Sequence, residues 1–289
     1  MAERKNINYF SICSVDLHEA LDSTDRVFIN DYVGIAMNVS PKKGAFLKEG
    51  EIYHIVEPRL LMVLSGEADG NLNLEEYHLQ QGMVMLTTSD VILESRCWSD
   101  DIKIIGMIIK EDIQVLDNIV LNLSPSEFDR LRRMTYIIWD IANLSPFRQN
   151  TVHSLLQAMV SDVEEIYAVM GTTDKERKPS RQQMLFQNFK KLVSQHCERE
   201  RSIPFYAEQL WISPHHLSAV ISKASGQSVM YWINRAVILR AKVLLNTSGL
   251  LSYEIADRLN FPSSAAFNKF FKRETGMTPG EYQKSRWLP

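Results

Sequence analysis

The sequence has few residues of the kind that cross-link a fold. Its 289 residues include three cysteines, Cys13, Cys97 and Cys197. The number is odd, and the wide spacing matches neither a disulfide framework nor a paired-cysteine metal site. We therefore expect a protein without disulfide bonds, in keeping with the reducing cytoplasm.

Long apolar runs are also missing. The most apolar stretch, residues 104–109, is far shorter than the ~20 residues of a membrane-spanning helix. The first residues, Met-Ala-Glu-Arg-Lys-Asn, lack the apolar segment of a secretory signal. The sequence thus predicts a cytoplasmic protein with no membrane contact.

Groupings of residues that carry catalysis are absent as well. His54 and His78 stand 24 positions apart, and the sequence around them has no His-x-His pair. A metal site needs several converging ligands, and we find neither a nucleophile–base motif nor a phosphate-binding loop. We expect no metal, no cofactor and no enzymatic activity.

Charge is divided unequally along the chain. Residues 175–289 hold 18 Lys/Arg and 8 Asp/Glu, a net charge of +10, whereas residues 1–174 hold 14 and 27, a net charge of −13. The apolar fraction of 45% and the length predict two globular domains. A basic domain beside an acidic one indicates that one of them binds a polyanion.

The N-terminal part, residues 1–110, is rich in short β segments separated by glycines. The spacing of these segments predicts an antiparallel sandwich or barrel. We expect strands at residues 27–39, 60–64, 72–74, 83–87, 91–94 and 102–109.

Residues 111–170 change to a helical pattern. Ser124-Pro-Ser-Glu127 is a capping box with proline at the first helical position. A second helix, which we expect to begin at Ser145-Pro146, carries an apolar stripe from Val152 to Met170. Either the two helices cover the sandwich, or part of the stripe serves another copy of the chain. Residues 171–181, polar and broken by Gly and Pro, are predicted to be an interdomain linker.

Two stretches near the C-terminus repeat each other about fifty positions apart. Residues 213–228 and 263–278 each predict a short amphipathic helix, opened by a serine cap and closed by Gly226 or Gly276. A further short helix precedes each, near residues 207–210 and 255–259. The sequence therefore predicts two helix-turn-helix units, joined by a longer helix over residues 228–246.

At these residues the sequence resembles the AraC/XylS family of bacterial transcription regulators. The resemblance covers about residues 182–285 and is densest in Phe267-Asn-Lys-Phe-Phe-Lys272 and Gly276-Met-Thr-Pro279. Three positions depart from the family pattern: Asn260, Trp211 and Val237. Asn tolerates positive φ, so the turn at Asn260 is expected to form.

The resemblance implies an α+β multidomain protein. Residues 1–110 would form a cupin-like jelly roll that senses a small-molecule effector, and residues 182–289 an all-α double helix-turn-helix domain that binds double-stranded promoter DNA. It also implies a homodimer, with a seam within residues 111–170 that we place at Leu155, Met159 and Ile166. RNA polymerase would be a further partner of an activator. The alternatives are a regulator whose N-terminal domain binds a protein, and a cupin-like enzyme with a DNA-binding tail.

In the second helix of each helix-turn-helix unit, the helical period indicates which residues are buried and which face outward. The outward residues near the start of such a helix meet base edges in the major groove, and the resemblance places DNA contacts at the same positions. We expect base contacts from His215, Ser218, Ala219, Ser222, Ser264, Ala265, Asn268 and Lys269. We expect phosphate contacts from Ser213, Lys223, Ser263, Lys272 and Arg273.

Overall fold

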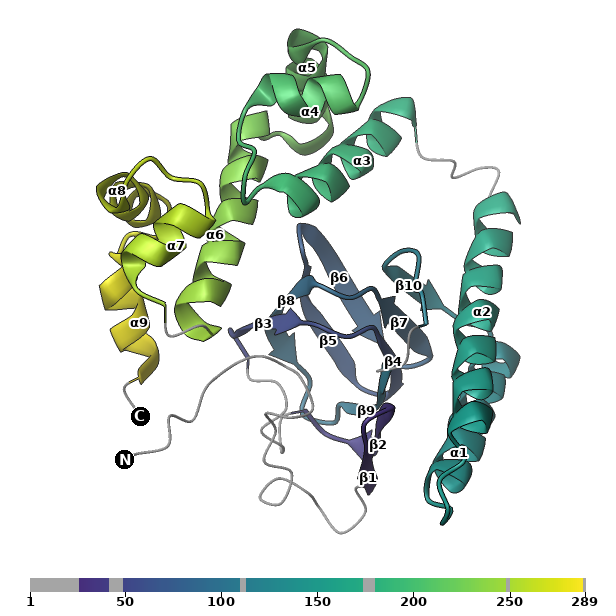
Figure 1. Cartoon of the computed structure of the whole chain (residues 1–289). Coiled ribbons are helices and arrows are strands. Elements are labelled where there is room, and N and C mark those ends of the chain that lie inside the picture. Colours follow the sequence, from purple (N-terminus) through teal and green to yellow (C-terminus); the bar gives the residue numbers. More distant parts are fainter. Residues whose placement is uncertain (1–25, 42–48, 110–112, 174–179, 248–249, 288–289) are drawn as a thin grey trace, which may run out of the picture. The chain divides into compact units, whose positions relative to one another are not determined.

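The chain forms two compact units, seen in a computed structural model that describes residues 26–41, 49–109, 113–173, 180–247 and 250–287 (Figure 1). Most of the predicted linker, residues 171–181, lies outside the described residues. No helix among the described residues is long and apolar enough to cross a membrane.

The N-terminal unit contains an antiparallel β-sandwich, as predicted. One sheet has six strands in the order β1-β2-β9-β4-β7-β10, and the other has four in the order β3-β8-β5-β6. The six-stranded sheet consists of β1 (Arg26–Ile29), β2 (Val33–Val39), β9 (Lys103–Ile109), β4 (Arg59–Ser65), β7 (Met83–Thr87) and β10 (Ile119–Asn122). The four-stranded sheet consists of β3 (Ile52–Ile55), β8 (Val91–Trp98), β5 (Glu67–Leu72) and β6 (Glu75–Gln80).

The strands differ from the sequence prediction in several places. Residues 27–39, expected as one segment, hold both β1 and β2, and strands β5 and β6 were not predicted. Strand β10 lies beyond residue 110 and pairs with β7, so the sheet extends into the region expected to be helical. Strand β3 was not predicted. Residues 72–74, expected to form a strand, contain the turn between β5 and β6, where Asn73 has a φ of 55°.

Two apolar cores lie on opposite faces of the six-stranded sheet, because alternate side chains of a strand point to opposite sides. The core between the sheets is filled by bulky side chains that include Tyr53, Tyr77 and Trp98. The core on the outer face joins Met62 and Met107 of the sheet to Leu131 and Ile138 of the helices.

The outer face is covered by helices α1 (Pro125–Ala142) and α2 (Gln149–Thr173), which run side by side (Figure 1). The predicted capping box opens α1: the Ser124 side chain accepts from the Glu127 backbone N–H, and Glu127 accepts from the Ser124 backbone N–H at 2.9 Å. Arg130 of α1 forms a bidentate ion pair with Asp162 of α2 at 3.0 Å. Helix α2 begins at Gln149, four residues later than Ser145.

The packing of α2 buries two of the three residues of the predicted dimer seam. Met159 and Ile166 are 2% and 8% exposed and belong to the core against the sheet. Leu155 is partly buried against the same core. The apolar stripe therefore packs on the sandwich, which buries Met159 and Ile166 and leaves Leu155 partly exposed.

The C-terminal unit contains α3 (Arg181–His196), α4 (Ile203–Gln209), α5 (Pro214–Ser225), α6 (Val229–Thr247), α7 (Ser252–Arg258), α8 (Ser264–Thr275) and α9 (Pro279–Trp287). Figure 1 shows α4–α5 and α7–α8 near opposite ends of α6. At 1.5 Å per residue, α6 is about 28 Å long. This confirms the predicted all-α fold with a long connecting helix.

Candidate nucleic-acid interface

The first helix-turn-helix unit is α4, a tight turn and α5. The Ser213 hydroxyl caps α5 by accepting from the His216 backbone N–H at 3.2 Å. Gly226, with a φ of 69°, ends the helix in the left-handed region. Leu217, Val220 and Ile221 are buried, as their periodicity predicts.

The second unit, α7, a turn and α8, repeats these features. The Ser263 hydroxyl accepts from the Ala266 backbone N–H at 3.1 Å, and Gly276 ends α8 at a φ of 82°. Phe267 and Phe271 are fully buried, and Phe270 packs against the same core. Its turn is one residue longer. One residue separates the left-handed Trp211 from the cap Ser213, whereas Phe261 and Pro262 separate the left-handed Asn260 from the cap Ser263.

The two turns use different residues for the same backbone conformation. Asn260 has a φ of 53°, which confirms that asparagine supports the turn where the resembled family has glycine. In the first unit Trp211 occupies this position with a φ of 56°, and its side chain is 94% exposed. A bulky residue in the left-handed region costs about 1–2 kcal/mol, and this side chain has no packing that offsets the cost.

Most of the predicted base-reading residues lie on exposed helix faces. His215, Ser218, Ala219 and Ser222 of α5 are exposed, as are Ala265 and Lys269 of α8. The Ser218 hydroxyl, however, donates to the Pro214 carbonyl at 2.9 Å, so its outward proton is engaged within the helix.

Asn268 and Ser264 lie at the edge of the buried face and not at its outward centre. Both are half-buried. Asn268 is one residue from Phe267, a turn of about 100°, and Ser264 is three residues away, which brings it to within about 60° of Phe267 around the helix. The Asn268 Oδ1 atom is covered and has no hydrogen-bond partner among the described residues. The centre of the exposed face of α8 is therefore formed by Ala265, Lys269 and Lys272.

The residues predicted to contact phosphates are all exposed: Ser213, Lys223, Ser263, Lys272 and Arg273. Within the described parts of the chain, Lys223 and Lys269 make no ion pair, so their charges are available to a polyanion. Arg273 differs, because its guanidinium donates twice to Glu274 Oε1, at 2.9 and 2.6 Å. The same Glu274 oxygen accepts from Asn234 of α6 at 3.2 Å, which ties Arg273 to the connecting helix.

A set of contacts that was not predicted joins the two helix-turn-helix units within the C-terminal unit. Arg201, just before α4, donates to the Asn260 carbonyl and lies 3.9 Å from the centre of the Phe261 ring. The Asn260 side chain donates to the Arg199 carbonyl at 2.8 Å. The start of the first unit is thus fixed to the turn of the second, about sixty residues later in the chain.

We call these contacts among Arg199, Arg201, Asn260 and Phe261 the clasp. Helical periodicity could not predict the clasp, because its residues all lie in loops. The only local signals were a positive-φ residue at position 260 and an aromatic after it. Nothing in the sequence marked Arg201 or Arg199 as partners.

His54 and His78 of the N-terminal unit lie beside different carboxylates. His54 Nε2 lies 2.5 Å from Asp90, whereas His78 Nδ1 lies 3.0 Å from Asp69. Across the described ranges no three His, Cys, Asp or Glu side chains are placed to hold one ion. Burial raises the pKa of the Cys197 thiol to about 12, so this thiol is unreactive at neutral pH.

Sequence comparison identifies the type of domain in the C-terminal unit. A family described as "Helix-turn-helix domain" matches residues 206–285. The arabinose operon regulatory protein of Salmonella typhimurium is 28% identical over 92 residues, covering 32% of this chain and 33% of that protein. The uncharacterized regulator YpdC of Escherichia coli is 32% identical over 71 residues, 25% of each chain. The regulatory protein PocR of Salmonella typhimurium is 23% identical over 189 residues, 64% and 60% of the two chains.

These alignments span a limited part of the regulators. The chain matches 25% of YpdC, 48% of the Escherichia coli regulator YijO and 12% of the Bacillus subtilis regulator YtdP. Among solved structures, the C-terminal domain of AraT from Geobacillus stearothermophilus shares 25% identity, with coverage of 38% and 92% and a TM-score of 0.36. ToxT from Vibrio cholerae shares 15% identity, with coverage of 90% and 97% and a TM-score of 0.38.

Proposed function

The chain carries the DNA-binding domain of an AraC/XylS-type transcription regulator, and from this premise we propose that it binds promoter DNA through two recognition helices in successive major grooves. The observation that carries the proposal is the paired geometry of α5 and α8. Each is capped by serine, each buries one apolar face, and each leaves the opposite face exposed. Successive major grooves on one side of a duplex are about 34 Å apart, and a connecting helix of about 28 Å has a comparable length.

The exposed faces supply chemistry of two kinds. Lys269 is suited to the acceptor edge of guanine, and His215 can donate to the same edge. Ala219 and Ala265 can contact only a thymine methyl group. Lys223 and Lys272 would bind phosphates, which position a protein without reading sequence.

The two units would not contribute equally to specificity. The outward face of α5 offers small or neutral side chains, with Ser218 already bonded to its own helix. The face of α8 offers Lys269 and the Nδ2 donor of Asn268. We therefore assign the larger share of base discrimination to the second unit.

The N-terminal unit would sense a small-molecule effector. It is an acidic, compact unit separate from the DNA-binding unit, which supports a sensing role apart from DNA binding. The alternative, recognition of a protein partner, would use the exposed surface of the helices. The relatives named above are regulators and not enzymes, which agrees with the expectation that the chain has no catalytic activity.

Self-association is a further proposal, but it requires a different surface from the one predicted. Ile137, Tyr167 and Val169 are 48%, 47% and 59% exposed on α1 and α2. These side chains offer apolar surface that a second copy could cover. Sedimentation velocity of the whole protein would show a concentration-dependent dimer, and a monomer at high micromolar concentration would contradict this. RNA polymerase is the expected partner if the protein activates transcription.

Genome-wide mapping of bound DNA tests the proposed function most directly. We expect discrete sites that share two short conserved blocks about one helical turn, ~10 base pairs, apart. The adjacent genes would indicate the effector. Uniform binding without a shared motif would contradict sequence-specific regulation.

A further inference from the structure

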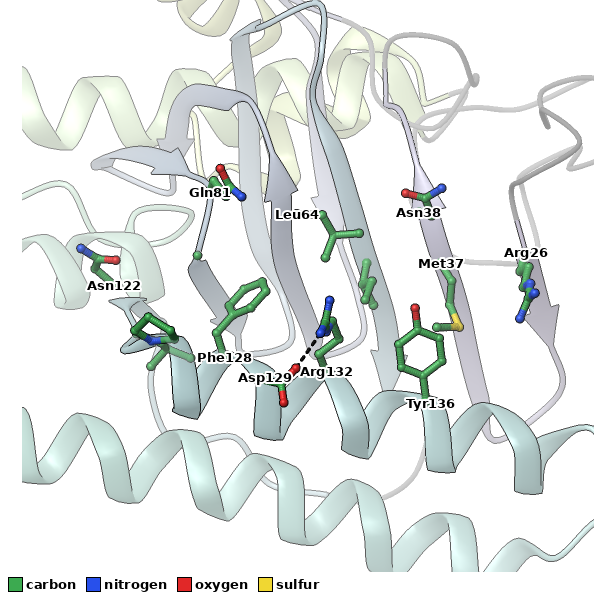
Figure 2. A pocket seen from close by; sticks show the side chains of 14 residues that line it. Arg26, Met37, Asn38, Leu64, Gln81, Asn122, Phe128, Asp129, Arg132 and Tyr136 are labelled. Atoms are coloured by element: carbon green, nitrogen blue, oxygen red, sulfur yellow. Dashed lines mark hydrogen bonds and ion pairs between the residues drawn. The ribbon is translucent and has the colours of Figure 1, made fainter.

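A hollow of about 790 Å³ lies in the N-terminal unit, between the first half of α1 and one end of the six-stranded sheet (Figure 2). Its volume is within the range of small-molecule pockets, about 300–1,000 Å³. All six strands, or the turns next to them, contribute to its wall: Arg26, Asn38, Ile105, Leu64, Gly82 and Asn122.

The sheet is deformed on both sides of the hollow's central strand, β9. On β2, the pairing shifts between Ala36 and Val39, so one extra residue is inserted. On β4, the pairing shifts between Val63 and Ser65, so Leu64 is the extra residue. Bulges bend a strand and redirect a side chain, and they are common next to functional sites. Here the two bulges place Asn38, with a φ of 61°, and Leu64 in the wall of the hollow.

The opposite wall is one face of α1. Phe128, Arg132 and Tyr136 are four residues apart, so they lie above one another on the helix and face the sheet (Figure 2). Arg132 is held in place by Asp129, at 2.6 Å. Asp129 also accepts from Arg133 at 3.1 Å, so its charge is shared between two guanidinium groups.

The charge of the hollow favours an anion. Arg26 on the sheet and Arg132 on the helix both line it, and Asp129 is its one acidic group. Among the residues that the structure describes, Arg26 makes no ion pair. The Tyr136 hydroxyl and the Asn38 amide add neutral donors. Guanidinium groups bind carboxylates through short, charge-assisted hydrogen bonds.

Part of the sheet wall of the hollow is apolar, formed by side chains that include Met37, Leu64 and Ile105. We infer that the hollow binds a small organic carboxylate, with its charge at Arg132 and its apolar body on these side chains. The space between the two sheets is not this site, because Tyr53, Tyr77 and Trp98 fill it. The inference rests on the proposed function, since it names the effector class for the sensing role.

The site would also connect the ligand to the helices. A ligand in the hollow contacts α1, and the Arg130–Asp162 ion pair joins α1 to α2. In the chain, α2 precedes the DNA-binding domain. A ligand in the hollow would therefore contact the helix that is tied to α2.

The test uses the whole purified protein and probes that differ only in charge. Phenylacetate and hexanoate are titrated by calorimetry and by thermal shift, beside 2-phenylethanol and 1-hexanol, which have similar apolar bodies. We expect each carboxylate to bind at least about tenfold more tightly than its alcohol, a difference of about 1.4 kcal/mol. Arg132→Gln should weaken carboxylate binding by a similar factor, and Arg26→Gln, which removes a charge elsewhere in the wall, should weaken it less.

Arg133→Gln is the matched control, because Arg133 is a neighbour of equal charge that does not line the hollow. It should change binding by less than about twofold. Equal binding of alcohols and carboxylates, equal losses for Arg133→Gln and Arg132→Gln, or no binding at millimolar concentration would overturn the inference. DNA binding is measured on the same protein without probe, so its failure would count against the proposed function alone.

Discussion

Arg201 and Phe261 belong to different helix-turn-helix units, and the guanidinium of Arg201 lies 3.9 Å from the centre of the Phe261 ring. Arg201 also donates to the carbonyl of Asn260 in the same turn. Partial burial lowers the pKa of Arg201, but the group stays charged at neutral pH. The relationship sets the position of the second unit relative to the first without using the connecting helix.

Loss of this contact should loosen the spacing of the two recognition helices. We expect Arg201→Ala to lower the free energy of unfolding by about 1–2 kcal/mol, since a partly desolvated cation–π contact and a charged hydrogen bond are both removed. Affinity for a two-block site should fall more than affinity for random DNA. Arg199→Ala is the control, because it removes an exposed charge two residues away and keeps the Arg199 carbonyl. Equal effects of the two substitutions would show that the clasp has no special role.

At the strained turn around Trp211 we expect a substitution that stabilises the fold. Trp211→Gly should raise the free energy of unfolding by about 0.5–1 kcal/mol, because glycine adopts positive φ without strain and the exposed indole loses no packing. Chemical denaturation measures this directly. Gly226→Ala, at a φ of 69°, should lower stability by a similar amount. A destabilised Trp211→Gly variant would mean that the indole has a partner within the chain.

Asn268 links stability to DNA recognition. Its covered Oδ1 has no partner among the described residues, so Asn268→Ala should leave the stability unchanged or raise it by up to about 1–3 kcal/mol. On the best site it should cost about 1–3 kcal/mol of affinity if the Nδ2 group reads a base, with little change on random DNA. Lys272→Ala should instead weaken binding to both kinds of DNA. It should also reduce the slope of log affinity against log salt concentration by about one.

Salt titrations of both variants on specific and random duplexes give the comparison. Circular dichroism first establishes that each variant is folded. If Asn268→Ala weakened both duplexes alike, its amide would have no part in base reading.

Helix caps and buried faces could be predicted from the sequence, because both depend on neighbours within one turn. The serine caps at 213 and 263, the glycines at 226 and 276, and the buried Leu217 and Phe267 follow from local spacing alone. The sandwich followed from short β segments and glycines, but strands β3, β5, β6 and β10 did not. Strands β3 and β10 are short and pair with partners far away in the chain.

The errors concern surfaces whose partner lies far away in the chain. The stripe that includes Met159 and Ile166 is apolar whether it packs on a sheet or on another copy, and only the tertiary structure decides between them. The half-burial of Asn268 and the clasp at Arg201 likewise depend on other elements. The hollow beneath α1 depends on two bulges, which sequence periodicity does not mark.

The capping box of α9 predicts an acid-sensitive part of the stability. Hydrogen bonds from the Thr278 backbone N–H and hydroxyl lower the pKa of Glu281 below its ordinary value of 4.5. A depressed carboxyl pKa stabilises the fold above the ordinary value, and the contribution is lost as the pH falls through the folded value. Glu281→Gln should therefore reduce stability at neutral pH and flatten the fall below pH 4.5.

Glu208→Gln is the control for this experiment, since the exposed Glu208 side chain makes no hydrogen bond or ion pair with any described residue. The measurement is thermal unfolding of both variants at pH values from about 3 to about 7. This range spans the ordinary glutamate pKa of 4.5. The same acid dependence in Glu281→Gln and the parent protein would rule out the capping box as its source.

Hydroxyl-radical footprinting of the whole protein on one of its genomic sites tests the central claim most directly, namely that α5 and α8 read successive major grooves. We expect two protected blocks on one face of the duplex, centred about 10 base pairs apart. Lys269→Ala should weaken the block under the second unit more than the other, and Lys223→Ala the reverse. A single protected block, or equal weakening of both blocks by each substitution, would contradict the claim.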